Sequence, residues 1–339
     1  MNTVKKIAVT AAVAYGGLHL ARMIVRRRRR FDWRGKRVVI TGGSRGLGLV
    51  IARRLADAGA KLAICARDEK AVYLAAAELR GRGAEVVAAA CDVRDDDQVA
   101  SFIGRVAEQF GGVDVLFNVA GIITVGPLDS MTQADFEDSM NTNCWGALNL
   151  ARHALPQMRA QGWGRIVNVA SLGGKRAVPH MLPYAASKFA LVGLSNGLRA
   201  ELKHENIFVT TACPGLMRTG SPRNANFKSQ HRHEYALFSI SDSLPVMSMS
   251  AEAAADQIIE ACRQGRGEIF IHGPLNVTIA LQQMFPELAQ EILAVGASVL
   301  PKMGGIGRSA AKGYQSESAW SPSMLTTLTQ RAAAANNEM

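Results

Sequence analysis

The sequence predicts an α/β protein in which a doubly wound parallel sheet forms a single domain. Short apolar runs alternate with helical patterns from residue 37 to residue 271, and this alternation is typical of parallel strands covered by helices on both faces. A glycine-rich turn joins the first strand to the first helix, as in sheets that bind ligands at their carboxyl edge. The chain has 339 residues, 48% of them hydrophobic, which is enough to bury a large core. We expect this domain over residues 31–273, with an N-terminal membrane helix before it and a C-terminal helical extension after it.

The amino-terminal segment, residues 1–30, predicts a membrane anchor. Residues 7–25 form a run of 19 without an acid, and a helix of that length rises about 28 Å, close to the hydrocarbon thickness of a bilayer. Five arginines, 26–30, follow directly. Because such a positive flank stays in the cytoplasm, we expect a single-pass anchor with the following domain on the cytoplasmic side. A cleavable export signal ending near Ala12-Val13-Ala14 is the alternative, but the arginines oppose translocation.

The charge of the chain is concentrated at its amino terminus. The net charge is +11, and residues 1–37 carry 11 Lys and Arg against one acid, Asp32, so the rest nets only +1. This distribution argues against a basic face that follows phosphates, and no nucleic-acid partner is expected. A nuclear-localisation signal or a nucleic-acid arm remains an alternative role for the arginines.

The five cysteines have no metal-ligand spacing and His231 and His233 lack a third ligand, so we expect buried thiols and no metal site.

The strands of the domain are expected where short runs rich in Val, Ile and Ala occur, at 37–41, 61–66, 85–90, 113–118, 165–170, 207–212 and 268–271, with the first two helices at 46–58 and 69–80. The first strand leads into Thr41-Gly42-Gly43-Ser44-Arg45-Gly46-Leu47-Gly48. Glycines in this pattern permit a tight turn and close approach of a pyrophosphate, while the helix amino terminus faces the anion. The turn therefore predicts a dinucleotide site.

The second strand favours NADP(H) as that dinucleotide. It ends in Cys65-Ala66-Arg67, without the acid that usually holds the ribose hydroxyls of NAD(H). Arg67 and Arg45 are expected to converge on a 2′-phosphate, since planar guanidinium groups suit bidentate contact. Asp92, followed by Val93, has two equal interpretations: it accepts a hydrogen bond from the adenine, or it caps the next helix.

The catalytic chemistry is expected from a tyrosine and a lysine four residues apart. Tyr184 and Lys188 lie on one side of a predicted helix, and a nearby cation lowers the pKa of a phenol, which makes it a candidate general acid/base. Ser171 follows the strand at 165–170, at the sheet edge where ligands bind. Its hydroxyl is expected to orient the substrate oxygen.

These motifs, in this order, resemble the short-chain dehydrogenase/reductase family over roughly residues 35–273. The resemblance implies a Rossmann-like domain, direct hydride transfer between a hydroxyl and a carbonyl group, and a catalytic tetrad of Asn143, Ser171, Tyr184 and Lys188. It also implies that Lys188 holds the nicotinamide ribose, that Asn143 supports a relay water and that Thr219 contacts the carboxamide. The expected cofactor contacts are Thr41, Gly42, Ser44, Arg45, Gly46, Leu47, Gly48, Arg67, Asp92, Val93, Asn118, Ala120, Gly121, Tyr184, Lys188, Pro214, Gly215 and Thr219.

One departure from the family pattern concerns the bracing of the sheet. The family commonly has NNAG where this chain has Asn118-Val119-Ala120-Gly121. Val119 lacks the amide that ties neighbouring strands together, so bracing near this point is in doubt. Asn118 itself is either a strand-end cap or a cofactor contact.

The remaining segments predict the substrate side and the surroundings of the domain. The family resemblance implies that residues 219–251 form a mobile lid over the substrate. Their apolar residues, which include Phe227, Tyr235 and several Met and Leu, favour a lipophilic small-molecule substrate. Steroid-like, retinoid-like, long-chain acyl and sphingoid ketones all fit. Residues 274–303 predict an amphipathic helix pair that packs on the protein, forms a dimer contact or dips into a membrane interface, and residues 304–339 predict a flexible tail. We expect a homo-oligomer, a dimer or tetramer, and a non-catalytic dinucleotide sensor is the alternative to an enzyme.

Overall fold

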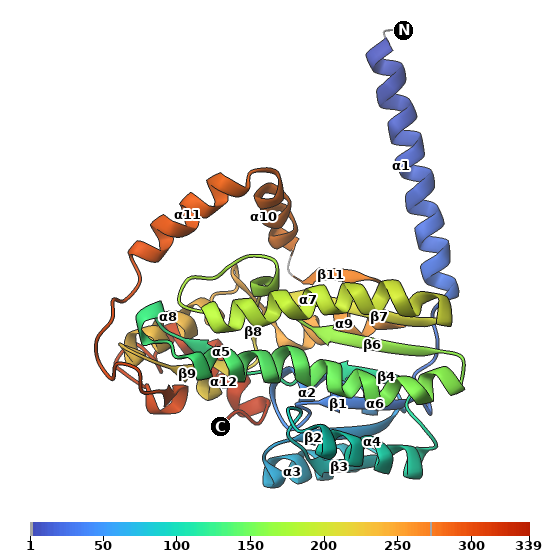
Figure 1. The fold of residues 1–339 in the computed structure, drawn as a ribbon, viewed down its shortest axis with the longest axis horizontal. Helices are drawn as coiled ribbons and strands as arrows, with labels where there is room; N and C mark the ends of the chain where they lie inside the picture. The colour runs from blue at the N-terminus through green and yellow to red at the C-terminus, as the bar shows by residue number, and fades with distance from the viewer. Residues whose placement is uncertain (1–2, 272) are drawn as a thin grey trace.

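The computed structural model describes residues 3–271 and 273–339, with side chains described for 16–271 and 277–339 (Figure 1). A parallel sheet of seven strands lies at its centre, in the order β11-β7-β6-β4-β1-β2-β3. The strands are β1 (Arg37–Thr41), β2 (Lys61–Ala66), β3 (Val86–Ala90), β4 (Val115–Asn118), β6 (Gly164–Val169), β7 (Ile207–Pro214) and β11 (Glu268–Ile271). Their ends lie within two residues of the predicted ones, so the parallel α/β architecture is confirmed.

Both faces of the sheet are buried because side chains alternate along each strand. Val38 and Ile40 of β1 point into one core, whereas Val39 between them points into the other. The first core lies under α2 (Gly46–Asp57), α3 (Glu69–Gly81) and α9 (Ala251–Arg263). The second lies under α4 (Asp96–Phe110), α6 (Gly146–Ala160) and the carboxyl end of α7 (Leu182–Leu202). All five cysteines are free and buried, as predicted.

Smaller elements extend the carboxyl edge of the sheet. A two-stranded sheet pairs β8 with β10, and a three-stranded sheet has the order β12-β9-β5. These elements are β5 (Thr124–Val125), α5 (Gln133–Met140), β8 (Leu216–Arg218), β9 (Asn226–Phe227), α8 (His231–Ser243), β10 (Ser248–Ser250) and β12 (Ala311–Lys312). Phe227 and Tyr235 are fully buried, with ring centroids 5.4 Å apart. The apolar residues that predicted a lid therefore include part of a packed core.

The amino-terminal helix α1 (Thr3–Arg28) projects from the domain (Figure 1). In the described part of the chain no helix is long and apolar enough to cross a membrane, so the spanning anchor predicted from the sequence is not seen. The side chains of residues 7–15, about half of the predicted span, lie outside the described residues. Leu18, Leu20 and Met23 on the rest of the helix are at least half exposed.

Two helices follow β11 where the helical extension is predicted. They are α10 (Gly273–Met284) and α11 (Pro286–Ser298), and together they arch away from the domain on the side to which α1 also projects (Figure 1). No residue of α11 is buried. Its Leu288, Ile292 and Val295 are 60%, 59% and 69% exposed. α11 thus presents an apolar surface to its surroundings, whereas α10 contacts β11 and buries Ile279.

The carboxyl-terminal segment, expected to be flexible, is ordered in the structure. β12 pairs with β9, and α12 (Thr327–Ala335) packs against α8. Gly220 allows this contact, since a Cβ added there would lie 2.3 Å from Ala333 Cα. Small and polar residues dock this segment, and such contacts leave no apolar periodicity in the sequence from which the docking could be predicted.

A buried carboxyl group joins this segment to α8. Thr329 Oγ1 donates to Asp242 Oδ2 at 3.0 Å, and Asp242 is 2% exposed. Burial raises the pKa of Asp242 to about 7, although the Thr329 hydrogen bond and Arg218 act in the opposite direction. The folded protein therefore holds this proton over a pH range in which the unfolded chain releases it.

We expect the free energy of unfolding to fall as pH rises from about 4 to 7, by at most about 1.4 kcal/mol per pH unit for this one proton, and then to level off. Asp242→Asn should remove that slope, because the amide does not titrate. Urea unfolding between pH 4.5 and 8.5 measures it, with Asp256→Asn as the control because Asp256 is an exposed acid. Parallel pH profiles for the wild type and Asp242→Asn would contradict the assignment.

Candidate active site

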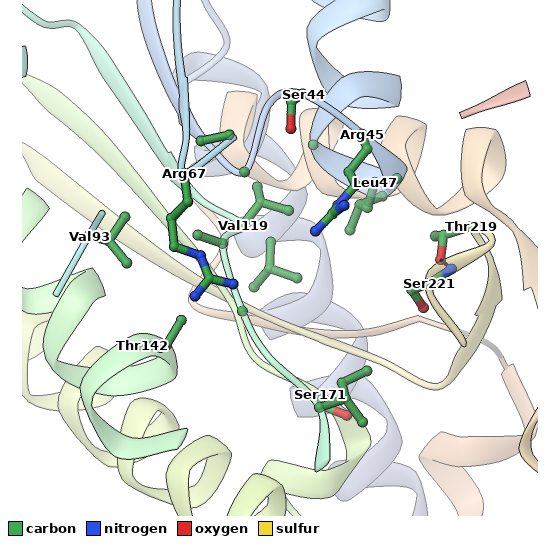
Figure 2. Close-up of a pocket in the computed structure, with 18 of the residues that line it drawn as sticks. Ser44, Arg45, Leu47, Arg67, Val93, Val119, Thr142, Ser171, Thr219 and Ser221 are labelled. Atoms are coloured by element: carbon green, nitrogen blue, oxygen red, sulfur yellow. Dashed lines mark hydrogen bonds between the residues drawn. The ribbon is translucent and has the colours of Figure 1, made fainter. Parts of the chain in front are cut away.

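A cleft of about 630 Å³ opens at the carboxyl ends of the central strands (Figure 2). The turn between β1 and α2 forms one wall. Gly46 adopts a φ of 55°, which disfavours a side chain, and a Cβ on Gly48 would lie 2.2 Å from the Gly42 carbonyl oxygen. These glycines bring the backbone close around the amino terminus of α2, where free amide groups attract anions.

Two arginines extend into the cleft from opposite sides, Arg45 from the glycine-rich turn and Arg67 from the end of β2 (Figure 2). The acid next to Arg67 is engaged elsewhere, since Asp68 accepts a hydrogen bond from Ala71 N at 2.9 Å and caps α3. A third cation comes from β12: burial lowers the pKa of Lys312, and the charges of Arg67 and Arg45 lower it further. Arg45 and Arg67 line the cleft, and their charges act on Lys312 nearby; Asp68 also lines the cleft, with its Oδ1 engaged in the cap of α3.

Asp92 lines the cleft beside Val93. Its carboxylate pairs with Arg94, whose Nη2 lies 2.6 Å from Oδ2. Burial acts to raise the pKa of Asp92, but the hydrogen bonds from Arg94 outweigh it and the pKa is lowered. The helix-capping alternative is wrong, because Asp95 caps α4 by accepting from Gln98 N.

Thr41 and Asn118 have bracing roles and do not line the cleft, unlike the other predicted cofactor contacts. Thr41 Oγ1 accepts from the amides of Val119 and Ala120 at 3.0 and 3.1 Å. Asn118 Nδ2 donates to Asn168 Oδ1 at 2.9 Å, which ties β4 to β6. These bonds brace the sheet where the valine of the NVAG sequence supplies no amide side chain.

The three central catalytic candidates lie together at the base of the cleft. Ser171 follows β6, and its hydroxyl is hydrogen-bonded to the phenol of Tyr184 in the first turn of α7. Lys188, one turn later, has its Nζ 5.7 Å from the centre of the Tyr184 ring and 2.9 Å from the Val169 carbonyl oxygen. This arrangement can place a substrate oxygen between a hydroxyl and a phenol.

The pKa of Tyr184 shifts in the direction opposite to the prediction. Burial raises the pKa of the phenol, and only the Ser171 hydrogen bond lowers it in part. Burial also lowers the pKa of Lys188, to about 8. Burial is the largest cause of both shifts, and the ammonium of Lys188 does not lower the pKa of the phenol as the prediction required. A phenol that keeps its proton at neutral pH is suited to act as the acid.

Asn143 lies behind these groups, in a π-helical turn (Asn141–Trp145) between α5 and α6. Its Oδ1 accepts from Ile122 N at 2.9 Å, and its Nδ2 donates to Ser187 Oγ at 2.9 Å. A Cβ on Gly121 would lie 3.0 Å from Asn143 Oδ1 and 3.6 Å from Lys188 Nζ, so the asparagine and the lysine meet at this glycine. π-helical turns occur often at functional sites.

Several residues of the site are absent from the sequence-based predictions, and two charged ones are Glu338 in the cleft and Lys312 close to Arg45 and Arg67. Glu338 lines the cleft although it is the second-last residue of the chain. Both belong to the segment expected to be flexible, and no motif links them to the glycine-rich turn. The described residues contain no group of three or more His, Cys, Asp or Glu that could hold a metal ion.

Comparison with known proteins identifies the family. The model of the short chain dehydrogenase family matches residues 36–230, and the chain belongs to this family. It is an oxidoreductase that acts on alcohol and ketone groups.

Relatives and solved structures agree with this assignment. Granaticin polyketide synthase putative ketoacyl reductase 1 of Streptomyces violaceoruber is 39% identical over 183 residues, 53% of this chain and 67% of that protein. Dehydrogenase/reductase SDR family member 7B of Danio rerio is 31% identical over 85% of this chain and 94% of its own length. Gluconate 5-dehydrogenase from Burkholderia cenocepacia, solved with NADP and tartrate, superimposes with a TM-score of 0.64 at 31% identity, covering 74% of this chain and 98% of that one.

Proposed function

We propose that the protein is an NADP(H)-dependent reductase that converts a ketone on a lipophilic small molecule into a secondary alcohol, with Tyr184 as the general acid. The observation that carries the proposal is the contact of Ser171, Tyr184 and Lys188 beside the cleft built by the glycine-rich turn. The Tyr184 phenol is protonated at neutral pH, so it can donate a proton to the carbonyl oxygen in the reductive direction. The hydride-transfer chemistry belongs to the cofactor.

The chain's own residues fit a dinucleotide carrying a 2′-phosphate. The glycines of the turn carry no side chain that would keep a diphosphate from the backbone amides at the amino terminus of α2. Arg45, Arg67 and Lys312 supply positive charge near the end of β2, while Asp68 is used as a helix cap. Gluconate 5-dehydrogenase, which has the same fold, was solved with NADP. Together these features favour NADP(H) over NAD(H).

In the proposed mechanism, Ser171 holds the substrate oxygen while the Tyr184 hydroxyl donates its proton to that oxygen. Lys188 is proposed to hold the nicotinamide ribose and to return a proton to Tyr184. Asn143, fixed by Ile122 and Ser187, is proposed to support the relay water. Ile123 and Met217 line the same cleft and favour an apolar substrate, whose carbonyl carbon would face the cofactor.

A screen of lipophilic ketones tests the proposed function. Oxidation of NADPH is followed at 340 nm in detergent with steroid-like, retinoid-like, long-chain acyl and sphingoid ketones, beside a small polar ketone. The proposal expects turnover with at least one lipophilic ketone, and its loss in Tyr184→Phe. NADPH binding without turnover on any ketone would instead favour a dinucleotide sensor.

We further propose that the protein attaches to a membrane through α1 and the α10–α11 pair, with the catalytic domain on the cytoplasmic side. All three helices project to one side of the domain (Figure 1). Leu288, Ile292 and Val295 expose apolar surface on α11, and arginines 26–28 at the end of α1 would suit anionic headgroups. We also propose a homo-oligomer.

Removing apolar contacts from α11 should weaken membrane binding. The double substitution Leu288→Asp and Ile292→Asp is expected to lower the vesicle partition coefficient at least about tenfold, since each buried side chain of this size contributes about 1.5–3 kcal/mol. Co-flotation with phosphatidylcholine–phosphatidylserine vesicles measures it in the full chain. Leu74→Asp changes an exposed leucine on α3 and is the matched control. Equal flotation of the double variant and the wild type would show that α11 does not touch lipid.

A further inference from the structure

The end of the chain enters the cofactor cleft. Gly46 N, at the start of α2, donates to the Asn336 carbonyl oxygen at 2.8 Å. Asn336 Nδ2 donates to the Thr219 carbonyl oxygen at 3.3 Å, and Asn337 adopts a φ of 57° that turns the chain toward the cleft. The terminal residues therefore lie between the glycine-rich turn and Thr219, both of which are expected to hold the dinucleotide.

Glu338 places a carboxylate at this point. It is 6% exposed, and its Oε2 accepts from Asn224 Nδ2 at 2.5 Å and lies 3.7 Å from Arg45 Nε. A Cβ on Gly46 would lie 2.6 Å from Oε1, so the carboxylate rests against the first residue of α2. Burial raises the pKa of Glu338, while Arg45 and Asn224 act to lower it.

The diphosphate of a dinucleotide bound as proposed would take this same position. The amino terminus of a helix that follows a glycine-rich turn attracts anions through its free amides and its dipole. Here the Gly46 amide bonds to a carbonyl of the tail, and Arg45 faces a carboxylate of the tail. A second anion at the same place would meet like charge, which costs binding free energy.

We infer that residues 336–339 form a gate on the cofactor site, in which Glu338 occupies the anion position at α2 and must withdraw before the dinucleotide binds. The inference rests on the proposed function, because it concerns the regulation of that same site. The gate can move without unfolding the rest of the tail. Arg53 Nη1 donates a hydrogen bond to the Ala335 carbonyl oxygen at 2.8 Å, and Ala333 is buried against Gly220. These contacts keep α12 docked while the last residues turn outward.

Two variants of the full-length protein test the gate through NADPH affinity. Glu338→Gln keeps the shape of the side chain and removes its charge, and a chain that ends at Ala335 removes the gate entirely. Both are expected to lower the Kd for NADPH at least about tenfold, measured by the fluorescence of the bound dinucleotide. Glu317→Gln is the matched control, since this exposed tail residue pairs with Arg223 outside the cleft and its variant should bind as the wild type does. Unchanged or weaker binding in the two variants overturns the gate.

Limited digestion with a carboxypeptidase gives a second readout that does not depend on a substitution. Saturating NADPH is expected to speed the release of Glu338 several-fold, because the tail leaves the cleft. Slower release of Glu338 with NADPH would mean that the tail closes over the cofactor. An unchanged rate of release would mean that the tail and NADPH do not contact each other. Either result would overturn the proposed gate. If neither the wild type nor the variants bind NADPH, the proposed function fails. If all bind equally and the wild type reduces ketones, only the gate fails.

Discussion

Replacing Tyr184 with phenylalanine is expected to lower kcat for ketone reduction by about 10²- to 10⁴-fold, the usual contribution of a positioned general acid. The substitution removes the hydroxyl that hydrogen-bonds to Ser171 and leaves the ring in place beside Lys188. The substrate oxygen would then have to take its proton from water. The Kd for NADPH should stay within about twofold, because the glycine-rich turn and the arginines are untouched.

Steady-state kinetics on the best ketone of the screen, with a fluorescence titration of NADPH, separates these effects. Tyr73→Phe provides the matched control, since Tyr73 is 44% exposed on α3 and lies outside the cleft. A Tyr184→Phe enzyme with more than a tenth of wild-type kcat would assign the proton donor to another group.

Replacing Arg67 with alanine is expected to raise the Kd for NADPH by about 10- to 150-fold. A hydrogen bond to a charged group contributes about 1.5–3 kcal/mol, which corresponds to that range of affinity. The Kd for NADH should change little, because this dinucleotide lacks the 2′-phosphate that the guanidinium is proposed to bind. The ratio of the two affinities therefore reports on the phosphate contact and not on general damage to the cleft.

Competition titrations with NADPH and NADH on the same preparations measure this ratio. Arg152→Ala removes an exposed arginine from α6 and serves as the control, with no expected change in either Kd. Equal losses of NADPH and NADH affinity in Arg67→Ala would place Arg67 away from the 2′-phosphate.

The sheet and much of the site could be predicted because their signals are local. A buried parallel strand needs a continuous apolar run, and the tight turn before α2 needs glycine. Each feature can therefore be recognised from a few neighbouring residues. Tyr184 and Lys188 are one helical turn apart, which the sequence shows directly. The β-α alternation predicts parallel strands, and the strand order seen in the structure brings Ser171 to them.

The features that the sequence analysis missed depend on contacts between distant segments. Asp92 and Asp95 are equally good helix caps as residue types, and only the path of the loop assigns the cap to Asp95. The pKa of Tyr184 depends on how deeply α7 is buried, which no spacing of residues reports. The docking of α12 depends on the space at Gly220, far from Ala333 in the sequence.

The location of Glu338 also matters for how the enzyme is produced. A purification tag or fluorescent partner joined after Met339 would start next to the nucleotide loop, where it would crowd the entrance and bias any affinity measured there. A tag joined to the amino terminus would instead extend α1. A tag that a protease removes before the assay avoids this bias.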